Sequence, residues 1–170
     1  AVAAIRGLTV LEQMGEVNSN RLGLVGTSGG GVATLIANGV DDRIRAAVPV
    51  SASGYLDLAV AAQPVRGWEW AFFSRQIPRH RGVPGVDCVA VVIVPKNYRA
   101  GAHGDVLLID GAQDEFFPIN SLTATFDDLA ATGGDHRILA IKDWDHGWFA
   151  LFVGDEPLAD TTDAVGYWLG

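Results

Sequence analysis

Short apolar runs alternate along this chain with segments in which apolar residues recur at helical spacing. The apolar runs cover residues 21–26, 44–50, 105–110 and 137–141, and the helix-like segments cover residues 1–15, 29–38, 118–132 and 160–169. Apolar runs without polar alternation are typical of strands that are buried on both faces, as in a parallel sheet covered by helices. The pattern therefore predicts an α/β fold with a mainly parallel sheet flanked by helices.

All four helical segments have a candidate apolar face, which in the second, residues 29–38, is formed by Val32, Leu35 and Ile36. In the first, apolar residues are spaced by threes, at Val2, Ile5, Leu8, Leu11 and Met14. Pro118 suits the first turn of the third, because its missing N–H has no partner there in any case. The inward faces are predicted to carry Ile119, Leu122, Phe126 and Leu129 in that helix, and Val165, Trp168 and Leu169 in the last one.

The length and composition predict one domain with a sizeable core. The chain has 170 residues, of which 49% are hydrophobic and 19% charged, so that wholesale disorder is excluded. Residues 54–103 are irregular and hold four of the seven prolines. We interpret them as an excursion or cap-like insertion within a single domain over residues 1–170, partly helical at 65–73 and with a possible strand at 89–94.

The charge balance and the apolar runs exclude several partners. The net charge of −8 argues against nucleic acid, which proteins hold mainly through Lys and Arg on phosphates. No apolar run reaches 18 residues, so that no membrane-spanning helix is predicted. No signal peptide is visible, but the front of the fold could be missing, and the compartment stays open.

Neither a cofactor nor a metal is predicted. The single cysteine, Cys88, allows no disulfide framework and no cysteine-based metal cluster, and we expect it to be a small buried hydrophobe. Asp143, Asp145 and His146 could ligate a metal, but a dense acidic loop is usually solvated. The arginines around residues 75–81 could bind an anion, although a solvated surface cluster is the simpler interpretation.

The sharpest local motif is Gly26-Thr27-Ser28-Gly29-Gly30-Gly31, between a predicted strand and a predicted helix. It satisfies G-x-S-x-G, the pattern of a nucleophile elbow, in a context that places a serine hydroxyl at the top of a sheet. A purely structural turn and another ligand loop stay open as alternatives. A P-loop would need a lysine, which is absent, and the glycines do not have dinucleotide-binding spacing.

A serine nucleophile needs a base and an orienting acid. His146 directly follows the last predicted strand, whereas His80 and His103 lie in or beside the excursion and His136 is interpreted as a solvated turn residue. Asp114 follows the third strand and is the first choice of acid.

Four other carboxyls are candidates for the acid, of which Asp143 and Asp145 lie too close to His146 in sequence to be the first choice. Glu115 is the alternative, and Asp110, inside the strand end, is interpreted as structural. Ser28, Asp114 and His146 each follow a strand, so that the three should meet at one edge of the sheet. Their chain order is the order found in α/β-hydrolases.

The sequence resembles the C-terminal half of an α/β-hydrolase of the prolyl-oligopeptidase-like and acetylxylan-esterase-like type. The similar segments are residues 21–31 around the elbow, 41–49 at the next strand, 107–118 at the acid and 145–147 at the histidine. The resemblance covers most of the chain except residues 54–94. It specifies the superfamily well and the substrate poorly.

The resemblance implies a reaction and its residues. Ser28 would attack an acyl carbonyl, His146 would take its proton, Asp114 would orient His146, and water would release the acid from the acyl-enzyme. The N–H of Gly29 would be one oxyanion donor. Members of the superfamily take the other donor from a loop after an earlier strand, and no such loop precedes Ser28 here.

We therefore expect that this chain lacks the N-terminal strands of the fold. Residues 22–25 would then form an exposed sheet edge that could pair with another chain. Feeble activity of this chain alone, or completion of the site by a partner, would follow.

Three functions remain open from sequence. The first is a serine hydrolase that cleaves a carboxylic ester, the second is a serine peptidase of prolyl-oligopeptidase type, and the third is a truncated, non-catalytic domain that pairs with a partner chain. The substrate is expected to be a small acyl ester or a peptide. The candidate substrate-binding residues are Thr27, Trp68, Phe116, Phe117 and Trp148.

Overall fold

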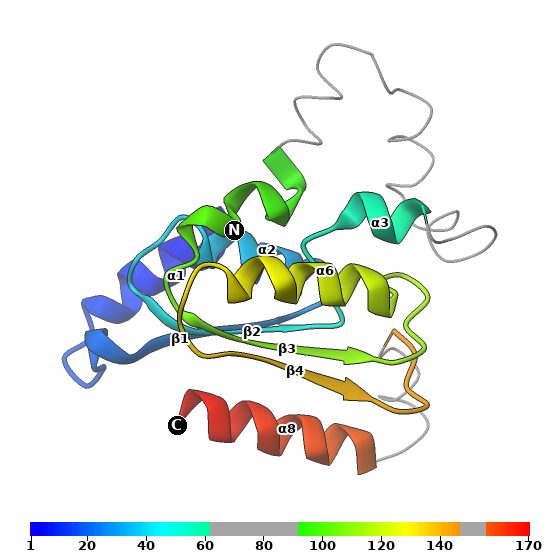
Figure 1. The fold of residues 1–170 in the computed structure, drawn as a ribbon. Helices are drawn as coiled ribbons and strands as arrows, with labels where there is room; N and C mark the ends of the chain where they lie inside the picture. The colour runs from blue at the N-terminus through cyan, green and yellow to red at the C-terminus, as the bar shows by residue number, and fades with distance from the viewer. Residues whose placement is uncertain (62–91, 147–155) are drawn as a thin grey trace.

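The computed structural model describes residues 1–61, 92–146 and 156–170, which form a parallel sheet between helices (Figure 1). The sheet has the order β1-β2-β3-β4 and every neighbouring pair is parallel. The strands are β1 (Leu22–Thr27), β2 (Ile44–Val50), β3 (Asp105–Gly111) and β4 (His136–Ile141). The predicted fold class is confirmed.

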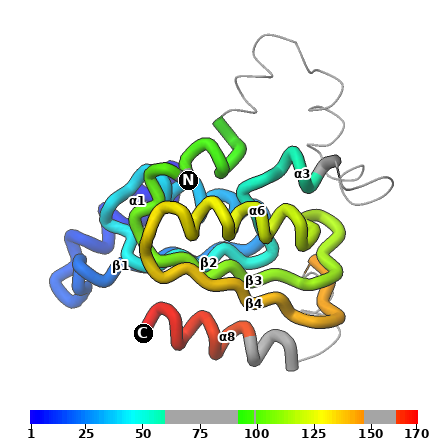
Figure 2. The backbone as a smooth tube through the Cα atoms, viewed as in Figure 1, coloured from blue at the N-terminus to red at the C-terminus, as the bar shows by residue number. Residues whose placement is uncertain are grey.

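The helices cover the two faces of the sheet unequally. The upper face in Figure 1 carries α1 (Val2–Glu12), α2 (Gly29–Asn38), α3 (Leu56–Ala61) and α6 (Ile119–Ala130). Helix α8 (Glu156–Leu169) covers the other face, so that the first and last residues lie on opposite sides of the sheet (Figure 2). Two 3-10 helices, η1 (Ser19–Arg21) and η3 (Pro95–Gly101), complete the described elements.

Each face of the sheet packs a separate apolar cluster. Alternate residues of β3 point in opposite directions, so that Leu108 joins the cluster under α1, α2 and α6, and Leu107 and Ile109 join the cluster under α8. Burial on both faces explains why the strands are continuous apolar runs. Within the described residues, no helix is both long enough and apolar enough to span a membrane.

Most predicted elements are present, with shifts of a few residues at their ends. Helix α2 and strand β2 have the predicted bounds, 29–38 and 44–50. The prediction of a possible strand at 89–94 is wrong for the described residues, because residues 92 and 93 are helical. Residues 89–91 lie outside the described part. The predicted excursion, residues 54–103, is described only at its two ends, by α3 and η3.

Several predicted side-chain positions are corrected. Four residues of the predicted apolar helix faces are exposed, namely Val2, Leu11, Met14 and Ile119, at 69%, 38%, 40% and 43%. A spacing of three drifts around a helix with 3.6 residues per turn, so that Leu8 is buried whereas Val2 and Met14 are not. His136 is not a solvated turn residue, because it begins β4 and its Nδ1 accepts a hydrogen bond from the N–H of Val106.

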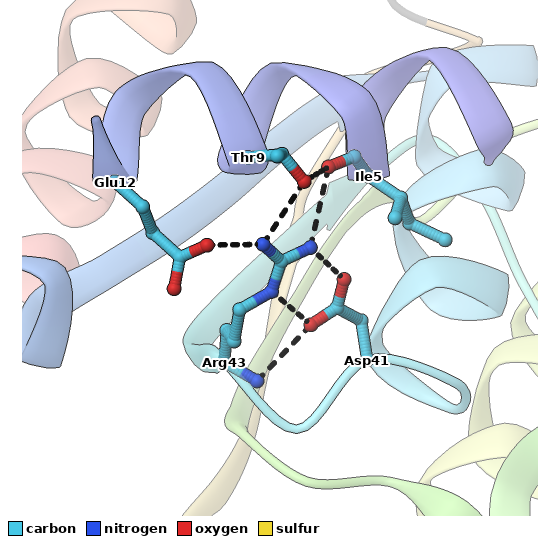
Figure 3. A network of polar contacts seen from close by, with 5 residues as sticks. All are labelled: Ile5, Thr9, Glu12, Asp41 and Arg43. Carbon is cyan, nitrogen blue, oxygen red and sulfur yellow. Dashed lines mark hydrogen bonds and ion pairs between the residues drawn. The ribbon is translucent and has the colours of Figure 1, made fainter. Parts of the chain in front are cut away.

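A guanidinium group joins α1 to the turn before β2 (Figure 3). The Nε and Nη2 atoms of Arg43 donate to the two carboxylate oxygens of Asp41, at 2.8 and 2.6 Å, and Nη2 also donates to the carbonyl of Ile5. The Nη1 atom donates to Thr9 Oγ1 and to the Glu12 carboxylate. The hydrogen bond from Arg43 holds the pKa of Asp41 below its usual value.

Replacing this arginine should loosen α1. We expect Arg43→Gln to lower the thermal unfolding midpoint measured by circular dichroism, whereas Arg45→Gln, at an exposed arginine of β2, should leave it nearly unchanged. The pKa of Asp41 is lowered on folding. The ionised Asp41 therefore makes its full contribution to the free energy of unfolding above the ordinary carboxyl pKa, and this contribution is lost as the pH falls through the lowered pKa. The gap between the wild type and Arg43→Gln should therefore narrow in acid. An equal effect of both substitutions would contradict the assignment.

Candidate active site

Ser28 lies at the sharp turn between β1 and α2, in a backbone conformation that few non-glycine residues adopt. Its φ is 55° and its ψ is −119°. The N–H of Ser28 donates to the carbonyl of Val50 at 2.8 Å, which ties the turn to the end of β2. Such a strained strand-to-helix turn is the geometry of a nucleophile elbow.

The elbow requires glycine at two positions for steric reasons. A Cβ at Gly26 would overlap the carbonyl of Gly30 and lie 2.8 Å from Thr34 Oγ1. A Cβ at Gly31 would lie 2.6 Å from the Cβ of Ala52. At Gly30, the second glycine of the sequence motif, a Cβ would meet no described atom within 4 Å. Close packing of α2 on β1 and on the end of β2 therefore leaves no room for a side chain at Gly26 or Gly31, whereas it leaves room at Gly30.

His146 forms hydrogen bonds with both other predicted residues. Its Nε2 is 2.8 Å from Ser28 Oγ, and its Nδ1 is 2.8 Å from Asp114 Oδ2. The side chains of His146 and Asp114 are 5% and 0% exposed. The structure therefore brings together three side chains that are 118 and 32 residues apart in sequence.

The four residues 114–117, here called the acid loop, each contact His146. Besides the Asp114 hydrogen bond, Glu115 Oε2 accepts from the main-chain N–H of His146 at 3.3 Å. The rings of Phe116 and Phe117 lie against the imidazole, with centroids at 4.5 and 5.6 Å. Phe117 is buried, at 3% exposure. One short loop therefore holds the main-chain N–H and the Nδ1 atom of His146 and packs two aromatic rings against its imidazole.

The acid loop is itself fixed by the carboxylate at its start. Asp114 Oδ1 accepts hydrogen bonds from the N–H groups of Phe116 and Phe117, each at 2.7 Å. Burial by itself raises the pKa of Asp114, but the interactions with His146 and then with Asp110 outweigh burial and hold this pKa below its usual value. Asp114 is therefore the ionised carboxylate that can stabilise an imidazolium.

Residues 142–146, which follow β4 and are here called the histidine loop, rest directly on the end of β3. A Cβ at Gly111 would overlap the carbonyl oxygen of Trp144 and crowd that of Asp145. The N–H of Gln113 donates to the Trp144 carbonyl at 3.0 Å, and the N–H of Ala112 donates to that of Ile141 at 2.8 Å. This close approach of main chains sets the height of His146 above the sheet.

The remaining sequence candidates are distributed as follows. Thr27 is exposed at the end of β1, whereas Trp68, Trp148, Cys88 and His80 lie outside the described residues. His136 begins β4, at the opposite end of the sheet from the site. His103 lies before β3, where its N–H donates to the carbonyl of Asn38. In the described part, no three side chains gather as metal ligands.

Sequence reasoning missed the contacts of Glu115, Phe116 and Phe117 with His146. Glu115 was weighed as an alternative acid, and the two rings were assigned to substrate binding. The sequence did contain a signal for these contacts, because the three residues directly follow Asp114. Residues next to an acid that contacts a histidine must also lie near that histidine.

Comparison with known families identifies the chain. The profile of the prolyl oligopeptidase family matches residues 4–151, a span that contains Ser28, Asp114 and His146. The chain belongs to the prolyl oligopeptidase family. A comparison with curated proteins finds no match.

Solved structures similar to this family member include both esterases and peptidases. The acetyl xylan esterase from Paenibacillus sp. R4 is 22% identical with a TM-score of 0.75, and the match covers 98% of this chain and 50% of that one. A puromycin-hydrolyzing peptidase of Mycobacterium tuberculosis is 23% identical with a TM-score of 0.69, covering 85% and 21%. The Pyrococcus horikoshii acylaminoacyl peptidase is 19% identical with a TM-score of 0.63, covering 86% and 23%.

These likenesses show the α/β-hydrolase fold. The chain spans between 21% and 50% of the length of the three structures.

The steric difference between two elbow glycines can be measured. We expect Gly26→Ala to lower the free energy of unfolding by about 1–3 kcal/mol, the usual cost of overpacking. Gly30→Ala, the matched control inside α2, should change it by less than about 1 kcal/mol and toward stabilisation, because alanine favours helix. Urea unfolding followed by fluorescence measures both. Equal destabilisation by the two substitutions would rule out the packing argument.

Proposed function

We propose that this chain carries the reacting residues of a serine hydrolase that cleaves a carboxylic ester through an acyl-enzyme. The observation that supports this most is the unbroken chain of hydrogen bonds from Ser28 Oγ through His146 to Asp114. Ser28 is the proposed nucleophile, His146 the base and Asp114 the orienting acid. Membership of the prolyl oligopeptidase family supports the same assignment.

The proposed mechanism follows from the atoms in contact. His146 Nε2 takes the proton of Ser28 Oγ as the oxygen attacks the acyl carbon, and the imidazolium formed is stabilised by Asp114 at Nδ1. Collapse of the tetrahedral intermediate transfers that proton to the leaving alcohol and leaves an acyl-serine. Water, deprotonated by His146, then attacks the acyl-serine. The bond between the acyl carbon and Oγ breaks, His146 returns the proton to Ser28 Oγ, and the carboxylic acid is released.

The developing oxyanion has one proposed donor in the described chain. Gly29 is the first residue of α2, and the N–H groups of a first helical turn have no partner within the helix. The N–H of Gly29 would therefore point a donor and the positive end of the helix dipole at the oxyanion. Thr27, Trp68, Phe116 and Trp148 remain proposed substrate contacts. Phe117 is proposed mainly to pack against the imidazole of His146, because little of the Phe117 side chain is exposed.

A peptide substrate is the second candidate. The matching family is named for an oligopeptidase, and two of the three similar structures are peptidases. The same nucleophile and base serve both reactions. A small acyl ester or a peptide is therefore the proposed substrate class, with the ester placed first.

A third candidate is a non-catalytic domain that pairs with another chain through β1. In the described part, β1 pairs with β2 alone, and Val25 at this edge is 49% exposed. Unpaired N–H and C=O groups of an edge strand can accept a further strand. Self-association without any reaction at Ser28 would favour this function.

Covalent labelling tests the nucleophile directly. A fluorophosphonate probe should modify Ser28, as located by mass spectrometry, and Ser28→Ala should abolish the adduct, whereas Ser19→Ala, at an exposed serine of η1, should not. Asp114→Asn should slow labelling by several orders of magnitude, about 10⁴-fold where an orienting aspartate has been replaced elsewhere. Absence of labelling in a folded sample would remove the catalytic proposal for this chain.

Matched substrates separate the two enzymatic candidates. The initial rates for a p-nitrophenyl ester and a p-nitroanilide with the same acyl group are compared after division by each uncatalysed rate, because esters are intrinsically more reactive. We expect the larger acceleration, abolished in Ser28→Ala, for the ester. A larger acceleration for the anilide would assign the chain to peptide cleavage.

A further inference from the structure

A second carboxyl lies behind the proposed triad acid, and the mechanism above does not use it. Asp110 is the penultimate residue of β3 and is wholly buried, at 0% exposure. Its Oδ1 accepts a hydrogen bond from the N–H of Gly111 at 2.8 Å. Its Oδ2 is also buried, and within the described residues this oxygen has no hydrogen-bond partner that meets ordinary geometric limits.

The strands on either side of Asp110 offer it no positive charge. Ser51 lies beside it on the β2 side, because the Ser51 N–H donates to the carbonyl of Ile109 at 2.8 Å. On the β4 side, the residue in register is Ala140. Among the described residues, no lysine or arginine forms an ion pair with Asp110.

The charged groups on the remaining side belong to the site. They are Asp114, which interacts with Asp110 directly, and beyond it His146, whose main-chain N–H is held by Glu115. Asp145, in the histidine loop that rests on Gly111, adds another carboxyl with a buried oxygen. Among the charged groups just named in the described part of the chain, only His146 can become a cation, and its imidazole is paired with Asp114.

A buried carboxylate without a cation takes up a proton instead of remaining charged. Two carboxyls in contact also cannot both ionise easily, so that one proton is shared between them. Asp114 accepts from His146 and from two N–H groups, and therefore keeps the negative charge. Burial, followed by the charge of Asp114, raises the pKa of Asp110 to about 10.

We propose that Asp110 is a positioning residue, held as a neutral carboxylic acid whose proton is directed at Asp114, and that it fixes the orientation of the carboxylate that holds His146. The pair then carries a single negative charge. No proton leaves the pair during the reaction. The catalytic consequence rests on the proposed function, whereas the protonation of Asp110 does not.

Two substitutions and one control separate this role from simple packing. Asp110→Asn keeps the shape of a neutral acid and a donor, and Asp110→Val fills strand volume without a donor. Asp105→Asn alters an exposed carboxyl at the other end of the same strand. The infrared spectrum of the wild type at neutral pH should contain the carbonyl band of a protonated carboxylic acid. This band should be lost in Asp110→Asn and kept in Asp105→Asn.

The pH dependence of stability supplies a second readout. Because the pKa of Asp110 is raised on folding, the unfolded chain loses this proton at a lower pH than the folded chain. The wild type should therefore lose stability relative to Asp110→Asn as the pH rises from the ordinary carboxyl range toward about 10. Asp105→Asn should show no such trend. Urea midpoints measured across this range decide the comparison.

The rate of fluorophosphonate labelling then tests the positioning role. Asp110→Asn should label at nearly the wild-type rate, and Asp110→Val should label about tenfold to hundredfold more slowly, as a misplaced catalytic group does. Absence of the acid band in the wild type, or stability trends that do not differ between wild type and Asp110→Asn, would overturn the proposal even if Asp110→Val fails to fold. If the band is present but Ser28 is never labelled, the proposed function fails and the protonated Asp110 stands.

Discussion

The parallel ladder from β1 to β4 determines where every group of the proposed reaction lies. Ser28 follows β1, Asp114 follows β3 and His146 follows β4, and all these strands end at the same edge of the sheet. Parallel strands place the loops that follow them at one edge of the sheet. Neighbouring strands are about 4.8 Å apart, so β1 and β4 end about 14 Å from each other, and the loops after β3 and β4 must reach back toward Ser28 for the observed hydrogen bonds to form. The hydrogen bond from the Ser28 N–H to the Val50 carbonyl fastens the first of these loops to the neighbouring strand.

The acid loop converts this rough placement into a defined geometry. Its four consecutive residues contact the imidazole at Nδ1, pack two aromatic rings against it and accept the main-chain N–H of His146. Gly111, just before the loop, lets the histidine main chain approach the sheet without a side chain between them. Orientation of His146 toward Ser28 is thus a property of residues 111–117 more than of the histidine loop. A protonated Asp110 beneath the loop would extend this support into the core.

Much of the fold could be predicted from the sequence because apolar runs and turn residues are local signals. The helix after Ser28 and strand β2 were predicted at their observed bounds. Ser28, Asp114 and His146, which were expected to meet because each follows a strand, are joined by hydrogen bonds. Side-chain direction was harder to predict. Val2 and Ile119 match a helical apolar pattern, but each is the first residue of its helix and is exposed.

Other features depend on tertiary contacts that carry no local signal. The arginine that joins α1 to the turn before β2 acts across about thirty residues, and nothing in its immediate sequence indicates partners on a distant helix. The pairing of Asp110 with Asp114 also depends on the course of the main chain after β3. The same is true of Phe116 and Phe117, whose aromatic character fits a substrate pocket and a histidine support equally well. Only their distances to the imidazole distinguish the two roles.

The central claim is that Asp114, His146 and Ser28 form one connected hydrogen-bonded chain in the free protein. Proton NMR of the folded chain tests it most directly, because an imidazole Nδ1–H that donates to a buried carboxylate resonates far downfield and is protected from exchange. We predict such a resonance, correlated with the Nδ1 of His146, and we predict that it is lost in Asp114→Asn. A well-folded wild type without that resonance, or a resonance that persists in Asp114→Asn, would contradict the account.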